Sequence, residues 1–201
     1  MNTKKSFLQA LKSFFTEPRW EKVRGIFWFC LIIIGIHILW KFWSATLNLY
    51  PVKGLIDSTE RFLVYHLFNE SSFIISHILK IKFLTVGNSM IMENGIGLVL
   101  SGSASGLKQM IQFVLIIMIF HGPWKHKIWF IPAGIIILHL TNVFRIVCLA
   151  IISIHWPQQI QYSHDTYLRI LYYLVVFALW LVWVEKIAVS LRPRASCPPN
   201  Q

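Results

Sequence analysis

The sequence predicts an all-α polytopic membrane protein, and three features support this. Of the 201 residues, 56% are hydrophobic and 15% are aromatic, a composition too apolar for an ordinary soluble domain. Long uncharged runs recur at residues 25–40, 110–120 and 171–184. Each approaches the roughly 20 residues that about 30 Å of hydrocarbon requires. Lysine and arginine gather at the ends of these runs, as they do around membrane spans.

The basic excess, a formal net charge of +11, would also suit a nucleic-acid-binding protein. Such proteins carry a basic stripe with interleaved aromatic residues, and this sequence has no such stripe. The charge therefore indicates membrane topology, and no nucleic-acid partner is expected. The three cysteines form neither a metal-ligand spacing nor a disulfide framework, so we expect no metal and no cofactor.

Four core transmembrane helices are expected, at residues 24–45, 106–121, 128–152 and 167–185. Basic clusters precede the first span, separate the second from the third and follow the fourth, which places both termini in the cytoplasm. Residues 1–201 then form one integral membrane domain. Its remaining parts are a basic cytoplasmic N-terminus at 1–23, an extracytoplasmic or interfacial segment at 46–105 and a basic cytoplasmic tail at 186–201.

The segment between the first two spans is expected to hold a helix and a small β-hairpin or meander. Residues 57–82 suit an amphipathic helix on the outer interface, with Asp57 and Glu60 as its capping box. A helical hairpin that dips into the membrane is the alternative. The polar side of the helix would carry His66, Asn69, Glu70, His77 and Lys80. Strand-like runs follow at 82–86, 89–92 and 96–100, separated by Gly-Asn and Asn-Gly pairs that favour tight turns.

Polar residues from three segments are expected to meet at the extracytoplasmic face. A small-residue turn that contains Ala104 opens the second span, Arg145 lies near the outer end of the third, and His164 precedes the fourth. Asn142 is one turn from Arg145, so both side chains can point into the bundle. Arg145 could instead reach up to lipid headgroups, and His164 could be a solvent-facing loop residue beside a helix N-cap.

The turn before the second span has the chemistry of a nucleophile site. Unpaired backbone N–H groups and the positive end of a helix dipole meet there, so a cysteine in this turn would ionise more easily. Ser105 follows Ala104, and Lys108 extends the polar patch into the span. The small residues could instead serve close helix packing.

The run Ala-Ser-Gly-Leu at 104–107 resembles the Cys-Ser-Gly-Leu motif of the exosortase/archaeosortase family, with alanine in place of the cysteine. Asn-Val-Phe-Arg at 142–145 resembles the family's Asn-x-x-Arg motif, and His164 stands at the third motif's place. The resemblance covers about residues 88–186. The order of the three motifs, their membrane context and their expected placement at the outer face all agree with the family.

The resemblance implies an intramembrane cysteine transpeptidase. Exosortases are proposed to recognise a C-terminal sorting signal, which consists of a short motif, one transmembrane helix and a basic cluster. The cysteine would attack a backbone carbonyl, release the helical tail and hold the remainder as a thioester until an acceptor, such as a lipid or a glycan, resolves it. Arg145 would then stabilise the thiolate or the oxyanion, and His164 would act as general acid and then base. Asn142, Ser105 and Lys108 are the implied substrate-binding residues.

Ala104 departs from the family at the decisive position, because a methyl group cannot be a nucleophile. We therefore expect that the chain as written does not perform the first covalent step. A deliberate cysteine-to-alanine replacement and a natural inactive homologue both explain the alanine, and the intact surroundings favour the first. The implied location is a bacterial or archaeal cytoplasmic (inner) membrane, with the site facing the extracytoplasmic side.

Other classes of protein remain open. A rhomboid-like serine protease would use Ser105 with His164, although four spans and the position of Arg145 suit it poorly. A noncatalytic membrane binding or scaffold protein would need no nucleophile. A transporter would show paired broken spans at the bilayer midplane, and the sequence has no clear pair.

Overall fold

The computed structural model describes residues 21–42, 52–120, 122–159 and 168–188. The chain divides into two compact units, residues 1–48 and residues 49–201. The described part of the first unit is one helix, α2 (Glu21–Phe42). Its mean hydropathy reaches 2.0 over Gly25–Phe42, so α2 is apolar enough to be the predicted first span. The expectation of a single domain stays a prediction.

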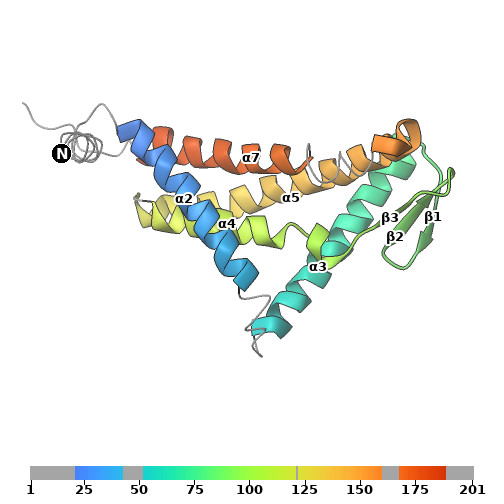
Figure 1. The fold of residues 1–201 in the computed structure, drawn as a ribbon, viewed down its shortest axis with the longest axis horizontal. Helices are drawn as coiled ribbons and strands as arrows, with labels where there is room; N and C mark the ends of the chain where they lie inside the picture. The colour runs from blue at the N-terminus through green and yellow to red at the C-terminus, as the bar shows by residue number, and fades with distance from the viewer. Residues whose placement is uncertain (1–20, 43–51, 121, 160–167, 189–201) are drawn as a thin grey trace, which may run out of the picture. The chain divides into compact units, whose positions relative to one another are not determined.

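The second unit is helical apart from one small sheet. Its α-helices are α3 (Val52–Phe73), α4 (Leu107–Ile119), α5 (Trp124–His155) and α7 (Leu168–Val182). Its short helices are the π-helices η3 (Ile74–Ile78) and η7 (Trp183–Ala188) and the 3-10 helices η4 (Gly102–Ala104) and η5 (Pro157–Gln159). Helices α4, α5 and α7 contact one another, and α3 packs on α5 (Figure 1). The predicted class, an all-α polytopic membrane protein, is confirmed.

Within the described residues, three helices are long and apolar enough to cross a membrane, over Gly25–Phe42, Trp124–His155 and Ile170–Ile187. They correspond to the first, third and fourth predicted spans. The second predicted span is α4, an apolar helix of only 13 residues. It rises about 20 Å, less than the roughly 30 Å of a hydrocarbon core. Its contacts with α5 and α7 place this short helix against two longer ones.

Helix α3 corrects two expectations about the segment after the first span. It begins at Val52, so Asp57 and Glu60 lie inside the helix and cannot form the predicted capping box. In the sequence, Pro51 stands directly before Val52, and proline is favoured at helix starts. The helix continues through η3 toward the sheet, so the alternative of a helical hairpin is also wrong.

The predicted strands form a three-stranded antiparallel meander, β1 (Phe83–Val86), β2 (Ser89–Met92) and β3 (Gly97–Val99). Gly87 and Gly95 lie in its two turns with φ of 58° and 80°, a conformation that glycine adopts readily. The Asn94 side chain fixes the second turn, because its Oδ1 accepts from the Ile96 N–H and its Nδ2 donates to the Ser153 carbonyl. The sheet is thereby attached to the end of α5.

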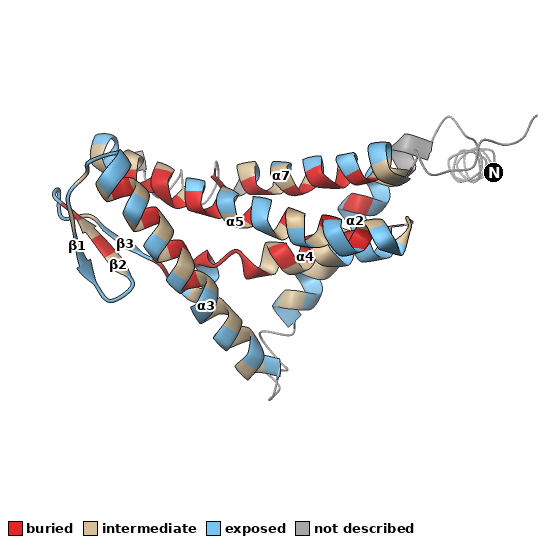
Figure 2. Ribbon diagram, turned by 180° about the vertical axis from the view of Figure 1, so that it is seen from behind, coloured by how far each residue is buried: buried red, intermediate tan, exposed pale blue. Residues whose placement is uncertain are grey.

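The second unit is packed differently at its two ends. Near the sheet, aliphatic side chains of α3, β2 and α5 form one buried cluster, with Leu67, Met90 and Ala150 fully buried. At the other end, aromatic rings of α4, α5 and η7 meet: the ring centroids of Phe130 and Trp183 are 5.3 Å apart. Figure 2 shows the buried residues on the facing sides of α4, α5 and α7.

Lys127 lies inside the protein at this aromatic end. Its side chain belongs to the first turn of α5, is 4% exposed, and donates from Nζ to the carbonyl oxygens of Met118 and Phe120, both at 2.9 Å. The ammonium group also lies 5.2 Å from the ring of Trp124. Because the last carbonyls of a helix lack partners within it, Lys127 caps the C-terminal end of α4.

Candidate functional site

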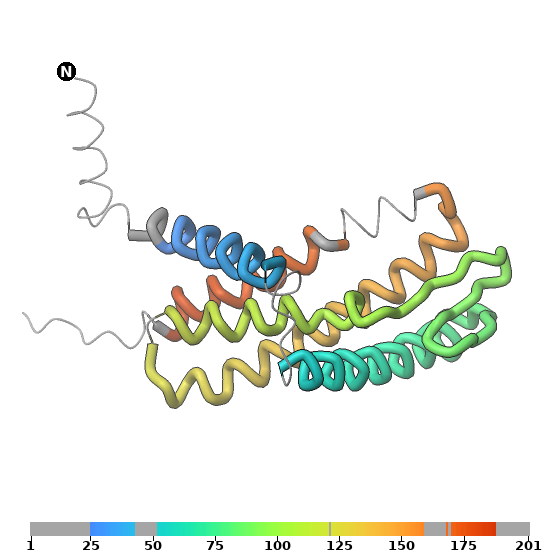
Figure 3. The backbone as a smooth tube through the Cα atoms, turned by 60° about the horizontal axis from the view of Figure 1, so that its bottom comes forward, coloured from blue at the N-terminus to red at the C-terminus, as the bar shows by residue number. Residues whose placement is uncertain are grey.

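The turn that carries Ala104 lies between the sheet and α4. Figure 3 shows the chain running out along α3, reversing in the sheet and returning through this segment. In η4 the Ala104 N–H donates to the Ser101 carbonyl at 2.8 Å, and the Ser105 N–H donates to the Gly102 carbonyl at 3.1 Å. Gly106 then adopts φ 77° and is the N-cap of α4. Ala104 therefore lies in a separate tight turn, η4, just before α4 begins.

Two side chains of α5 converge on the carbonyl oxygen of Ala104. Asn142 donates from Nδ2 at 2.8 Å, and Arg145 donates from Nη2 at 3.2 Å. The two residues are one helical turn apart, which lets both reach the same atom. Asn142 is fully buried and Ala104 is 8% exposed, so these hydrogen bonds are largely shielded from water. The arrangement holds the backbone of residue 104 against α5.

The other predicted site residues have different outcomes. Ser105 is buried beside Ala104, and its hydroxyl oxygen accepts a hydrogen bond from the Leu107 N–H at 3.2 Å. Lys108 is half-buried in the first turn of α4. His164 falls in residues 160–167, outside the described residues. The structure thus brings Ala104, Ser105, Asn142 and Arg145 together, and their chemical roles stay predictions.

The sequence analysis did not identify Tyr172, which also reaches this turn. Tyr172 lies on α7 and is 1% exposed. A Cβ atom added at Gly106 would lie 3.0 Å from the Tyr172 hydroxyl oxygen and 3.1 Å from Asn142 Nδ2. The signal in the sequence was a hydroxyl-bearing residue within an apolar span, on the helix that follows His164.

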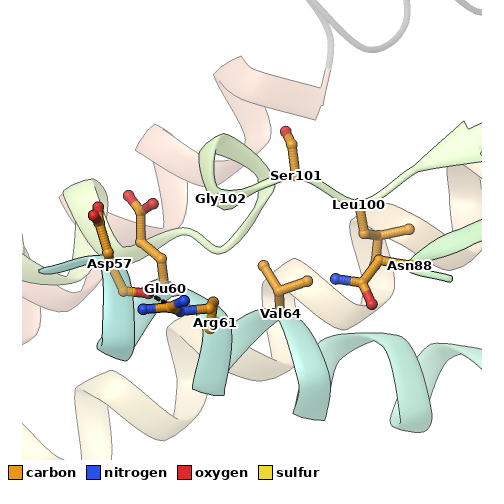
Figure 4. A pocket seen from close by; sticks show the side chains of 8 residues that line it. All are labelled: Asp57, Glu60, Arg61, Val64, Asn88, Leu100, Ser101 and Gly102. Carbon is orange, nitrogen blue, oxygen red and sulfur yellow. Dashed lines mark hydrogen bonds between the residues drawn. The ribbon is translucent and has the colours of Figure 1, made fainter. Parts of the chain in front are cut away.

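A cavity of about 350 Å³ opens beside the same turn (Figure 4). It is lined by residues of α3, of the β1–β2 turn and of the segment that follows β3: Asp57, Glu60, Arg61, Val64, Asn88, Leu100, Ser101 and Gly102. The carboxyl groups of Asp57 and Glu60 lie at one end of the cavity, and the Asn88 amide lies at the other. The cavity thus begins two residues before Ala104.

Glu60 is the residue of this cavity whose protonation the fold alters. Partial burial raises the pKa of its carboxyl group, and the neighbouring charge of Asp57 raises it further. The carboxylate also lies against the Gly102 backbone, where a side chain on residue 102 would collide with it. The absence of a side chain at Gly102 therefore allows α3 to approach the turn closely.

Glu70 and His139 form a second polar contact between α3 and α5. His139 Nε2 lies 3.0 Å from Glu70 Oε2, and the side chains are 18% and 42% exposed, respectively. The sequence analysis predicted that Glu70 lies on the polar side of an interfacial helix, whereas in the structure its carboxylate contacts His139 of α5. Among the described residues, no group of three or more histidine, cysteine or acidic side chains could hold a metal ion.

A model of the transmembrane exosortase family matches residues 20–184. No curated protein and no solved structure matches the chain. The matched segment includes α2, the sheet, the Ala104 turn and the two donors of α5, and it extends into η7. Because the match covers most of the chain, and because the motifs at residues 104–107 and 142–145 meet at one turn, we conclude that the chain belongs to the transmembrane exosortase family.

Proposed function

We propose that this protein has the architecture of an exosortase transpeptidase and binds membrane proteins that end in a sorting signal. That signal would comprise a short motif, a transmembrane helix and a basic cluster. The observation that carries the proposal is the pair of hydrogen bonds from Asn142 and Arg145 to the carbonyl of residue 104. They position the one residue at which the family's motif has its nucleophile.

In a form with cysteine at residue 104, the thiolate sulfur would bond to the carbonyl carbon of the scissile peptide, and the carbonyl π electrons would move to oxygen. Arg145 would stabilise the resulting oxyanion. As the C–N bond breaks, His164 would give a proton to the leaving amine, and the remainder would stay on sulfur as a thioester. An acceptor hydroxyl or amine, of a lipid or a glycan, would attack the thioester carbonyl carbon as His164 removes its proton, and the C–S bond would break to return the thiolate.

The cavity beside Ser101 and Gly102 supports this proposal. A protease-like enzyme must hold an extended stretch of substrate next to its nucleophile. With about 350 Å³ of space two residues from Ala104, the cavity has room for a few substrate side chains. The substrate's transmembrane helix would meanwhile stay in the bilayer beside the bundle. The extracytoplasmic face of a cytoplasmic membrane is the proposed setting.

Ala104 also favours a second candidate function, a noncatalytic receptor for the same signal. A methyl side chain lets substrate enter but cannot attack it, so the chain as written would bind without cleaving. The rhomboid-like alternative receives less support. The Ser105 hydroxyl accepts a backbone hydrogen bond from Leu107. Its expected partner, His164, lies outside the described residues.

The test compares the chain as written with Ala104→Cys and Ala104→Ser, each expressed with a reporter that ends in a transmembrane helix and a basic cluster. We expect processing only with Ala104→Cys, because a serine hydroxyl has a far higher pKa and needs a well-aligned base. Ser105→Ala in the chain as written tests the rhomboid-like alternative. Cleavage by the chain as written that disappears with Ser105→Ala would replace our proposal with that one. Tight binding by all variants without processing would favour the receptor.

A further inference from the structure

The Tyr172 hydroxyl is a buried donor in contact with the Ala104 turn. The side chain is 1% exposed, and the hydroxyl has no hydrogen-bond partner among the described residues. It points at Gly106, since a Cβ atom there would lie 3.0 Å from the hydroxyl oxygen. The Asn142 amide approaches the same point at 3.1 Å, so the two polar atoms lie within about 6 Å of each other. Tyr172 thus lies with Asn142 at Gly106, two residues after Ala104.

An unpaired buried hydroxyl lowers the stability of a folded protein, whereas phenylalanine would fill nearly the same space without that loss. Two neighbouring donor atoms do have an acceptor. Asn142 Nδ2 and Arg145 Nη2 both donate to the carbonyl oxygen of Ala104. The Tyr172 hydroxyl is therefore a buried donor of this cluster whose hydrogen bond no described residue accepts, which suggests an acceptor that appears only during the reaction.

The backbone just after Ala104 lets buried donors come close to the turn. Gly106 has φ 77° and no side chain, so Tyr172 and Asn142 can approach the chain two residues after Ala104. The side chain of residue 104 is an alanine methyl group, which cannot accept a hydrogen bond. A cysteine at this position would add a sulfur atom, and its thiolate would accept hydrogen bonds from buried donors.

We propose that Tyr172 is a further residue of the site, and that its hydroxyl donates a hydrogen bond to the thiolate of a cysteine at residue 104. This inference rests on the proposed function. The hydroxyl keeps its proton throughout. Its hydrogen bond favours the thiolate over the thiol, and it shifts to the carbonyl oxygen of the substrate when the sulfur forms its bond to carbon.

The test measures the reactivity of residue 104 without any substrate. The full-length Ala104→Cys variant in detergent is alkylated with iodoacetamide across a pH series, and mass spectrometry follows the peptide that contains residue 104, which separates it from the other cysteines. Adding Tyr172→Phe should move the pH profile of alkylation at residue 104 to higher pH. It should also slow alkylation near neutral pH by about tenfold. Tyr173→Phe, the same change on the next residue, is the matched control and should leave the profile in place.

A second experiment makes the hydroxyl at residue 172 a stronger hydrogen-bond donor. Fluorotyrosine at residue 172 has a more acidic hydroxyl in the same position, so it should move the profile to lower pH. Identical profiles for Tyr172→Phe and Tyr173→Phe, or no response to fluorotyrosine, would overturn the inference. Failure of Ala104→Cys to process any reporter would count against the proposed function alone, because alkylation requires no substrate.

Discussion

The side-chain amide of Asn142 donates a 2.8 Å hydrogen bond to the carbonyl oxygen of Ala104, 38 positions earlier in the chain. A fully buried amide on α5 thereby holds the turn that precedes α4. Arg145 shares the same acceptor at 3.2 Å. The position of residue 104 therefore depends on α5 as much as on its own turn.

Asn142→Ala should lower the free energy of unfolding by about 1–3 kcal/mol, because it removes a buried hydrogen bond and leaves a small space. Unfolding in mixed detergent micelles measures the effect. Thr141→Ala is the control: the Thr141 hydroxyl donates to the Ile137 carbonyl within the same helix, and its loss should change stability by less than about 0.5 kcal/mol. Equal losses in the two variants would contradict a special role for the Asn142 contact.

Lys127→Met should destabilise the protein by about 1–3 kcal/mol, because the carbonyls of Met118 and Phe120 lose their donor inside the bundle. Methionine has a similar length, so the space stays filled. Lys125→Met removes an equal charge from an exposed position two residues away and should have little effect on unfolding. If both variants unfold alike, net charge rather than the cap of α4 explains the loss.

Glu60→Gln tests the raised pKa of the cavity carboxyl. A raised pKa in the folded protein means that folding favours the protonated carboxyl group. The stability that this group contributes is therefore present below the usual glutamate pKa, and it is lost as pH rises through the folded-state pKa. Glutamine stays neutral, so the variant should be more stable than the parent at neutral pH, with the difference shrinking as pH falls. Glu93→Gln, on an exposed turn of the sheet, is the control. A difference that grows on acidification would reverse the assigned direction.

Gly134→Ala tests the close approach of α4 and α5. A Cβ atom at residue 134 would collide with the ring of Phe113, which is fully buried and cannot easily move away. We expect a loss of about 1–3 kcal/mol, the usual range for overpacking a core. Gly97→Ala, where an added Cβ meets nothing within 4 Å, should be nearly neutral. Thermal denaturation in detergent followed by circular dichroism would compare the two.

Features that follow from local chemistry were predictable from the sequence. Hydrophobic runs located the spans, and the Gly-Asn and Asn-Gly pairs located the turns where Gly87 and Gly95 have positive φ. The one-turn spacing of Asn142 and Arg145 indicated a shared face, and the structure shows both donating to one atom. Regular patterns of this kind are set by helix and turn geometry within a short stretch of chain.

Apart from the meeting of the Ala104 turn with Arg145, contacts between distant segments were not predictable. The charge on Lys127 was interpreted only as a sign of topology, because nothing local shows that the end of α4 lies nearby. Glu70 was placed on a polar surface for the same reason, although His139 of α5 lies 3.0 Å from it. The capping box at Asp57 and Glu60 was wrong because the same spacing also occurs inside helices, and α3 begins at Val52.

The length of α5 links the site to the thickness of the membrane. With 32 residues, α5 rises about 48 Å, whereas a typical hydrocarbon core measures about 30 Å. Arg145 lies 21 residues after the first residue of α5, at a height of about 32 Å along the helix axis. A thicker bilayer would cover more of α5 and draw lipid tails toward this guanidinium group, and a thinner bilayer would leave it in water. The length of the lipid acyl chains should therefore change the surroundings of the Arg145 guanidinium group.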